Sequence, residues 1–503
     1  YSYDYAGHWQ RSLELRKLFF ENPNEILSTV YNSMNYHEYS YLPALFGLGL
    51  TVFNTSYGFF CLTIFIYFLM PTTILLQIVY FSYTNKYPYL PLASFIIFYP
   101  LYLTIFYGEV DVIGLFFILM ICLLIFIPKF EDIKISDFLL VNLYSFTAIF
   151  LRRWYLYCAV TIYLMLFIKY LAYYKFKPFS KSGLKDFAKI ISSGLIMLIV
   201  ILILFFPFFN NVINNNFSEA YSFYDREGKI AALINFYSIM ICAVALIGIY
   251  QLWKSNYKLN LALLIFSILL PCLLFFQIQS FEYHHYHMIN VSVYLLFLAG
   301  LVFILDKKIK VLSFISVSSL SIQSIAIFTL PYNTPVFTSI RKQPQVLEYK
   351  QDVVDFAYYL KSILTEDWQS AYIASGNSMI NDSIIRNAIL PDLDMPQIDF
   401  ATLDLRDGFP KDIEYIQYIV TFDPILYSDQ NYQHIFEVLS NAIWNEPLFK
   451  DVYNLIYETN IGNVKVQVYE KISDITPEMK EYFYNQMISY YPEHQDFFSY
   501  ILD

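Results

Sequence analysis

The feature that most restricts the fold of this chain is a series of apolar runs that are long enough, or nearly so, to cross a lipid bilayer. A helix needs about 20 apolar residues to span the hydrocarbon core. The chain is 57% hydrophobic and 20% aromatic, which is well above the usage of soluble proteins. We therefore predict a polytopic all-α membrane domain of about ten transmembrane helices. The expected spans are 57–80, 89–107, 112–127, 138–151, 155–171, 190–208, 229–251, 259–277, 289–305 and 311–330.

The charge changes sign after the last of these runs. Residues 1–334 carry 21 Lys and Arg against 16 Asp and Glu, whereas the rest of the chain carries 11 against 26. The second part also has a globular composition and the length of one ordinary domain. We divide the chain into an N-terminal segment, a transmembrane domain and a small acidic domain, at 1–56, 57–330 and 335–503.

Positive charge predicts which helix ends face the cytoplasm, because lysine and arginine concentrate in cytoplasmic loops. One set of the predicted loops carries 14 basic residues, and the opposite set carries four: Arg152, Arg153, Arg226 and Lys229. We place the sparsely charged set, the segment 1–56 and the acidic domain on the extracytoplasmic side of the cell membrane. One further helix before residue 1 would then bring the native N-terminus inside.

The segment 1–56 is expected to contain interfacial helices. Within "ENPNEILSTVYNSM", Asn22 can serve as N-cap and Pro23 as the first helical residue. The following helix should present one apolar face, formed by Ile26, Val30 and Met34. The apolar run 41–53 is too short to span comfortably, so we expect it to be re-entrant or interfacial.

The acidic part reads as a small extracytoplasmic α/β domain. Helices are predicted at 344–363 and 431–444 from their apolar spacing. Three stretches have the pattern of strands: "SAYIASG", "YIQYIVTF" and "VKVQVYEKI". The polar residues Asp404, Arg406 and Asp407 are expected to form a salt-bridged turn. No nucleophile motif, P-loop or dinucleotide fingerprint occurs in the chain.

Charged and histidine residues gather in the connections predicted to lie outside. Acidic side chains at the end of a bilayer are costly and often mark functional sites. The candidate residues are Asp4, His8, Glu109, Asp111, Arg152, Arg153, Asp225, Arg226, Glu282, His284, His285 and His287.

Simpler interpretations of these residues stay open. The acidic pair in "FYGEVDVIG" could cap the next helix, whose N-terminus favours a carboxylate. The arginines of "LRRWY" could anchor the protein to anionic lipid. The three histidines of "FEYHHYH" could bind a metal, but no second ligand cluster accompanies them. We expect them to be hydrogen-bond partners in a polar cleft.

In layout, the chain resembles the GT-C superfamily of integral membrane glycosyltransferases. The resemblance rests on Asp4 in the first outer loop, followed by interfacial helices, and on the second acidic motif "GEVD" in the next outer loop. The C-terminal α/β domain completes it. The stretch "LDLRDGFPKDIEYIQYIVTFDPILYSDQNYQHIFEVL" is similar to soluble domains of such enzymes from low-GC Gram-positive bacteria.

This resemblance implies transfer of a hexosyl or pentosyl group from a polyprenyl-phosphate carrier to an extracytoplasmic acceptor, with inversion at the anomeric carbon. The acceptor would be a cell-wall polymer such as teichoic acid, a capsular polysaccharide, a glycolipid or a protein, and no nucleic acid is involved. By position, Asp4 would be the general base, and Glu109 and Asp111 match the second acidic motif.

The departing phosphate needs cationic groups to stabilise its charge, and the outer connections offer Arg152, Arg153 and Arg226. We expect no cofactor. Oligosaccharyl transferases of the superfamily bind a divalent metal, for which Glu109 and Asp111 are the candidates here. Many enzymes that use monosaccharide phosphates do not need one, and we expect this second scheme.

Two other classes of function remain as alternatives. A transporter or flippase for a lipid-linked saccharide would need charged residues deep within the spans and an internal repeat, and the sequence contains neither. A non-catalytic membrane scaffold for wall synthesis would make the outer charges incidental.

Overall fold

The structure is a computed structural model. It describes residues 3–36, 40–84, 86–126, 130–175, 181–214, 226–255, 257–277, 281, 283–307, 317–318, 321–322, 349–366, 369–377, 380–389, 397–399, 409–410, 413–427 and 433–502. The chain divides into two compact units, Arg11–Gln345 and Val346–Asp503, the latter together with Tyr1–Gln10. Each unit has its own hydrophobic core.

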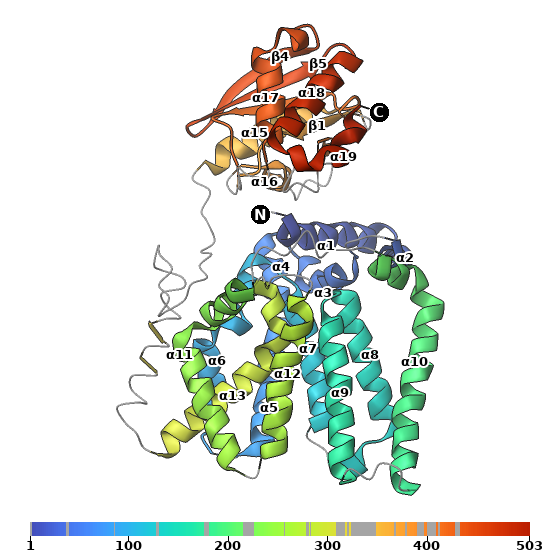
Figure 1. Cartoon of the computed structure of the whole chain (residues 1–503), viewed down its shortest axis with the longest axis vertical. Coiled ribbons are helices and arrows are strands. Elements are labelled where there is room, and N and C mark those ends of the chain that lie inside the picture. Colours follow the sequence, from blue (N-terminus) through green and yellow to red (C-terminus); the bar gives the residue numbers. More distant parts are fainter. Residues whose placement is uncertain are drawn as a thin grey trace. The chain divides into compact units, whose positions relative to one another are not determined.

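The unit Arg11–Gln345 is helical (Figure 1). Within the described residues, six helices are long and apolar enough to cross a membrane: Tyr57–Tyr83, Tyr155–Tyr173, Gly183–Asn210, Phe236–Lys254, Lys258–Phe276 and His284–Asp306. Together with the hydrophobic composition, these helices identify a multi-pass membrane protein.

The helices of the membrane protein follow one another along the chain in this order. They are α1 (Tyr3–Glu21), η1 (Pro23–Glu25), α2 (Ile26–Tyr36), α3 (Leu42–Thr51), α4 (Tyr57–Ile64), η2 (Phe65–Leu69), α5 (Met70–Tyr83), α6 (Leu90–Ile97), η3 (Tyr99–Leu101), η4 (Leu103–Tyr107), α7 (Asp111–Phe126), η5 (Phe130–Asp132), α8 (Ile135–Leu151), α9 (Tyr155–Tyr173), α10 (Lys181–Asn214), α11 (Arg226–Lys254), α12 (Lys258–Phe276), η6 (Tyr283–Tyr286) and α13 (His287–Asp306).

Three expected spans are not continuous helices. Span 190–208 is interrupted at Phe205 (φ −130°, ψ 29°) and span 229–251 at Ser238 (φ 64°, ψ 156°), and span 89–107 departs furthest from the prediction. In place of 89–107, the structure has the eight-residue α6 followed by the short 3₁₀ turns η3 and η4. Phe98 leaves the helical region at φ −99° and ψ 69°, and Pro100 has no N–H with which to continue the α-helical hydrogen bonds. The span 311–330 falls largely outside the described residues, so the total of about ten spans stays a prediction.

The N-terminal helices agree with their predicted apolar face. Ile26, Val30 and Met34 are buried together against residues of α1 and α3. Pro23 stands at the start of η1, as expected, but the Asn22 side chain makes no capping hydrogen bond. The run 41–53 forms the short helix α3.

The connections of the bundle gather at two ends. At one end, the Lys86 ammonium lies 2.7 Å from Asp306, and the Asn260 amide donates to the Tyr83 hydroxyl at 3.2 Å. These contacts join the end of α5, the start of α12 and the end of α13, all in the lysine-rich set of loops. The loops that contain Glu109, Arg152 and His284 meet one another away from this lysine-rich end. Which end faces the cytoplasm stays a prediction.

The helices α11 and α13 approach each other closely through two glycines. A Cβ atom on Gly248 would overlap the carbonyl oxygen of Leu296, and one on Gly300 would overlap that of Val244. Small residues permit such backbone contact between membrane helices. By contrast, a Cβ on Gly194 in α10 would meet nothing within 4 Å.

The unit that contains Val346–Asp503 is built on a five-stranded sheet in the order β2-β1-β3-β5-β4. The parallel part pairs β1 with β2 and β3, and the antiparallel part pairs β5 with β3 and β4. The strands are β1 (Ser370–Ile373), β2 (Gln397–Asp399), β3 (Tyr418–Asp423), β4 (Tyr453–Ile461) and β5 (Val464–Lys471). The helices are α15 (Lys350–Ile363), α16 (Asp382–Ala388), α17 (Ile435–Asn445), η8 (Pro447–Phe449), α18 (Pro477–Tyr490), η9 (Pro492–His494), α19 (Gln495–Phe498) and η10 (Ser499–Ile501).

Helices cover both faces of this sheet. Alternate strand residues point to opposite faces, so that Val420 packs with α15 and α16 whereas Ile419 packs with α17 and α18. This confirms the α/β architecture, the three expected strands and both expected helices. The sequence analysis missed β2, the edge strand β4 and α18. The turn at 404–408 lies outside the described residues.

The contact between α11 and α13 generates a stability prediction. We expect Gly248→Ala to lower the thermal midpoint of the detergent-purified protein, because its methyl group overlaps backbone that cannot rotate away. Overpacking of this kind typically lowers the free energy of unfolding by about 1–3 kcal/mol. The matched control is Gly194→Ala, which should leave the midpoint unchanged or slightly raised. Equal midpoints for the two variants, measured by size-exclusion chromatography after heating, would contradict the packing argument.

Candidate functional site

The site begins at the turn between η4 and α7. Gly108 adopts the left-handed conformation with φ 74°, and a Cβ there would overlap the Tyr57 hydroxyl. This tight turn returns the chain so that the Glu109 amide donates to the Thr104 carbonyl at 3.2 Å. Two carboxyl groups follow. Glu109 is 1% exposed and Asp111, the first residue of α7, is 0% exposed.

The turn between α8 and α9 supplies the positive charge. Arg152 ends α8, and its Nε lies 3.4 Å from Asp111 Oδ1. Its guanidinium carbon stands 4.9 Å from the centre of the Trp154 ring, in cation–π geometry. The Tyr155 hydroxyl donates to the Asp111 carbonyl oxygen at 2.7 Å. These contacts fix the end of α8 to the start of α7.

The third connection brings the histidines. His284 Nδ1 lies 3.3 Å from Glu109 Oε1, and His284 Nε2 lies 3.0 Å from His285 Nε2. Both imidazole rings contact Trp154, with ring centres 4.8 Å and 4.6 Å away. The Trp154 ring therefore contacts both the guanidinium and the histidine pair. We call Glu109, Asp111, Arg152, Trp154, His284 and His285 the charged cluster.

His287 is held behind this cluster by a hydrogen-bonded network. Its Nε2 lies 2.8 Å from the Thr104 hydroxyl, and its Nδ1 lies 3.1 Å from the Asn290 amide nitrogen. Asn290 also donates to the Pro100 carbonyl at 2.8 Å and accepts from the Tyr237 hydroxyl at 2.6 Å. The network connects η3, η4 and α11 to the first turn of α13. It fixes the ring of His287 rather than leaving it available to a ligand.

The electrostatics of the cluster are set by burial. Glu109 Oε2 and Asp111 Oδ2 are buried and accept no hydrogen bond from the residues that the structure describes. Burial raises the pKa of the Glu109 carboxyl above its ordinary value, and nearby His284 opposes this effect. A buried carboxyl favours its neutral form unless a cation lies next to it. The Arg152 guanidinium lies next to Asp111.

Glu109 and Asp111 are the candidate ligands for a divalent metal, and each already has a basic partner. The two carboxyl groups face separate basic partners, because Asp111 pairs with Arg152 and Glu109 with His284. Within the described part of the chain, no three His, Cys, Asp or Glu side chains come together as metal ligands. A metal held by both carboxylates would have to displace both partners.

The structure brings together part of the predicted set. Glu109, Asp111, Arg152, His284 and His285 lie in the cluster, with His287 behind it. Arg153, in the same turn as Arg152, is half-buried. Asp225 and Glu282 lie outside the described residues, as do the side chains of Asp4 in α1 and Arg226 in α11. His8 is buried and belongs to the other unit.

Sequence analysis missed several residues that hold the site. Thr104, Asn290 and Tyr237 are polar residues in or beside apolar runs, and that position was a signal, since polar groups at membrane depth need partners. Trp154 was visible within "LRRWY", but nothing in the sequence pairs it with the histidines.

Comparisons with known proteins leave the family open. No protein-family model matches the chain, and no curated protein matches it. A search of solved structures finds the archaeal oligosaccharyltransferase AglB from Archaeoglobus fulgidus, in complex with an inhibitory peptide and a dolichol-phosphate. The likeness covers 92% of this chain and 70% of that chain, at 10% identity and a TM-score of 0.39. At these values it says nothing about the activity of this chain.

The buried ion pair generates a second prediction. Arg152→Gln leaves the Asp111 carboxylate without its cation, and breaking a buried pair in this way typically lowers the free energy of unfolding by about 3–5 kcal/mol. We expect a lower thermal midpoint for Arg152→Gln and recovery when Asp111→Asn is added, because the second change removes the uncompensated charge. Lys17→Gln, at an exposed lysine of α1, is the control and should keep the wild-type midpoint. A single variant as stable as wild type would show that the pair does not hold the site.

A third prediction concerns pH. A carboxyl whose pKa is raised by folding contributes stability that is full below its ordinary pKa and is lost as the pH rises through the raised pKa. Glu109→Gln keeps a neutral side chain at every pH. We therefore expect the thermal midpoint of Glu109→Gln to rise relative to that of wild type as the pH increases above the ordinary carboxyl pKa of 4.5. The exposed Glu25→Gln variant should run parallel to wild type, and parallel curves for Glu109→Gln would contradict the assignment.

Proposed function

We propose that the chain is a membrane glycosyltransferase of the GT-C type, which moves a sugar from a polyprenyl-phosphate carrier to an acceptor outside the cytoplasm. One observation carries the proposal. Three connections far apart in the sequence meet in one buried cluster with two carboxyl groups, a guanidinium and an imidazole pair. Simple helix caps or lipid anchors would not require their convergence.

In the proposed reaction, an acceptor hydroxyl attacks the anomeric carbon of the sugar from the side opposite the phosphate. The bond from that carbon to the phosphate oxygen breaks, and polyprenyl phosphate departs with the bonding electrons. Asp4 takes the proton of the attacking hydroxyl as general base. Attack from the opposite side inverts the configuration at the anomeric carbon.

The charged cluster is suited to the phosphate side of this reaction. A phosphate that gains charge in the transition state is stabilised best by donors that are already fixed in place. Asp111 holds the Arg152 guanidinium, and Glu109 holds the His284 ring. We assign the two acidic residues a positioning role and the phosphate contact to Arg152, Arg153 and Arg226, with the His284 side chain beside them.

The same geometry supports transfer without a divalent metal. The Arg152 guanidinium already lies next to the carboxylate that a metal would need, and no step of the proposed reaction passes through a metal. The acceptor would be a glycan such as a cell-wall polymer. The two alternative functions, lipid-linked saccharide transport and scaffolding, make no use of a proton acceptor.

The proposal is tested by Asp4→Asn in purified full-length protein with synthetic polyprenyl-phosphate hexoses and membrane extract, read by mass spectrometry. Loss of a general base should lower the rate of transfer by about 10²–10⁴-fold. Glu25→Gln, in the same N-terminal segment, is the control and should keep the wild-type rate. EDTA should leave transfer by wild type unchanged. Near-normal turnover by folded Asp4→Asn, or translocation of lipid-linked sugar without a transfer product, would overturn the proposal.

A further inference from the structure

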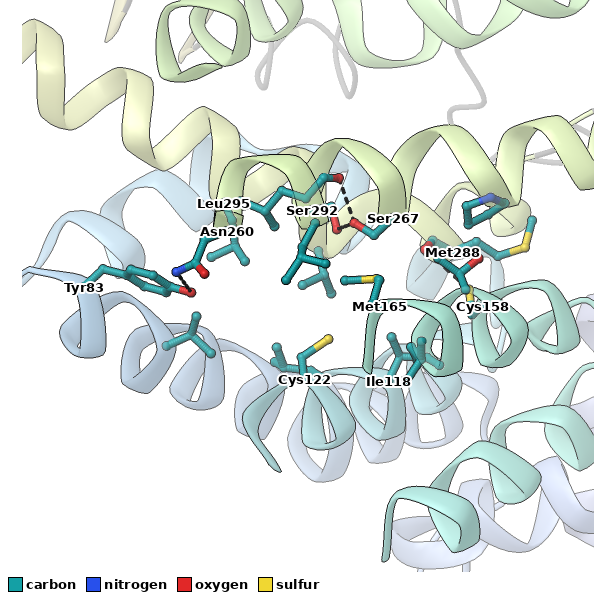
Figure 2. Close-up of a pocket in the computed structure, with 18 residues that line it drawn as sticks. Tyr83, Ile118, Cys122, Cys158, Met165, Asn260, Ser267, Met288, Ser292 and Leu295 are labelled. Atoms are coloured by element: carbon teal, nitrogen blue, oxygen red, sulfur yellow. Dashed lines mark hydrogen bonds between the residues drawn. The ribbon is translucent and has the colours of Figure 1, made fainter. Parts of the chain in front are cut away.

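Two adjoining cavities run through the interior of the helical unit, and the residues of the charged cluster do not line them. The first is walled by α5, α7, α9, α12 and α13 (Figure 2). The second is walled by α5, α11, α12 and α13 and reaches the lysine-rich end of the bundle. Four residues line both cavities and so lie where the two meet: Tyr83, Asn260, Leu264 and Leu295.

The cavities follow one face of α13. Their lining residues on this helix recur every three or four positions, as neighbours on one helix face do. They are Met288, Val291, Ser292, Leu295, Leu298, Ala299, Val302 and Asp306. Eighteen residues of helix separate the first from the last, which is a length of about 27 Å. This is close to the thickness of the hydrocarbon core of a bilayer, about 30 Å.

The interior of the cavities is suited to a hydrocarbon chain. The first cavity is lined mainly by aliphatic and sulfur-containing side chains, including Ile118, Cys122 and Met165 (Figure 2). Its polar side chains bond to one another: Ser267 to Ser292 at 2.5 Å, and Asn260 to Tyr83 at 3.2 Å. A lining of this kind offers packing surface rather than hydrogen bonds to an occupant.

The charge changes at the lysine-rich mouth. Lys86 lines the cavity with its side chain 61% exposed and contacts Asp306, which is 27% exposed, at 2.7 Å. An ammonium has three N–H donors, so Lys86 can serve a second acceptor besides Asp306. Three further exposed lysines each lie next in sequence to a lining residue: Lys254, Lys258 and Lys307. Their ammonium groups lie over the rings of Tyr250, Trp253 and Phe303, which do not line the cavities, so that four lysines against one aspartate give this end of the bundle, rather than the mouth itself, a positive excess.

We propose that one anionic glycerophospholipid of the membrane occupies these cavities, with a fatty-acyl chain along α13 and its phosphate at Lys86. The cavities are longer than the single leaflet that a fatty-acyl chain crosses, so that one chain fits within them. The positive end of the bundle matches the headgroup. A zwitterionic lipid would match the Lys86–Asp306 pair but not the excess of lysines. The proposal does not depend on the glycosyltransferase activity, because the charged cluster does not line the cavities and the proposed phosphate position at Lys86 lies at the opposite end of α13 from His287.

Native mass spectrometry of the full-length protein, extracted from nanodiscs that contain equal amounts of phosphatidylglycerol and phosphatidylethanolamine, tests the proposal. Wild type should retain one phosphatidylglycerol. Ala299→Phe fills the cavity and should lose this lipid, whereas Ala188→Phe, at an exposed alanine of α10, should retain it. Lys86→Gln removes the proposed phosphate contact and should reduce retention about tenfold. Lys185→Gln, an exposed lysine of α10, is its control.

Several results would overturn the proposal. Wild type that carries no lipid, or that retains phosphatidylethanolamine as well as phosphatidylglycerol, would remove the headgroup argument. Retention of added polyprenyl phosphate in place of phosphatidylglycerol would make the cavities part of the donor site instead. Unchanged phosphatidylglycerol retention in Ala299→Phe would place the lipid elsewhere on the protein. Helical circular dichroism and a monodisperse elution profile for each variant exclude misfolding as the cause of lipid loss.

Discussion

The ion pair between Arg152 and Asp111 is the interaction on which the candidate site depends. Both partners are removed from water, with exposed fractions of 8% and 0%, and neither charge is stable there without the other. The pair joins the end of α8 to the start of α7, and Trp154 lies against its guanidinium. The rings of His284 and His285 also pack against Trp154. An arrangement of this kind has its electrostatic field in place before any substrate arrives, which is the property that charge stabilisation in a low-dielectric site requires.

The backbone around the Arg152–Asp111 pair requires glycine at two positions. Gly108 is the position where the chain turns back sharply enough to bury Glu109, and its contact with Tyr57 leaves no room for a side chain. On the next helix, Gly114 lets the Tyr155 ring approach α7, so that its hydroxyl reaches the Asp111 carbonyl. The site is thus held by packing between helices and does not rest on loops alone. This supports a role for Glu109 and Asp111 in positioning the basic groups beside them.

The long helices and the central strands of the C-terminal sheet could be predicted from the sequence, because both follow from the spacing of apolar residues. It failed where backbone geometry decides: Pro100 and Phe98 break the expected span 89–107, and the half-exposed edge strand β4 lacks a regular pattern. The residues Glu109, Arg152 and His284 were expected to lie near one another because each stands in a connection predicted to face the outer side of the membrane. Their pairing was not predictable, since any of the basic groups could have faced either carboxyl group. Only the packing of α7, α8 and α13 decides that His284 faces Glu109 while Arg152 faces Asp111.

The glycine contact between α11 and α13 has a mechanical consequence. Two helices whose backbones touch at Gly248 and Gly300 cannot slide past each other without separating, so a displacement of one is a displacement of both. The first turn of α13 carries His287 and Asn290, and its last residue is Asp306. A tilt of α11 and α13 together would therefore move His287 and Asn290 at one end of α13 and Asp306, which lines the second cavity, at the other end.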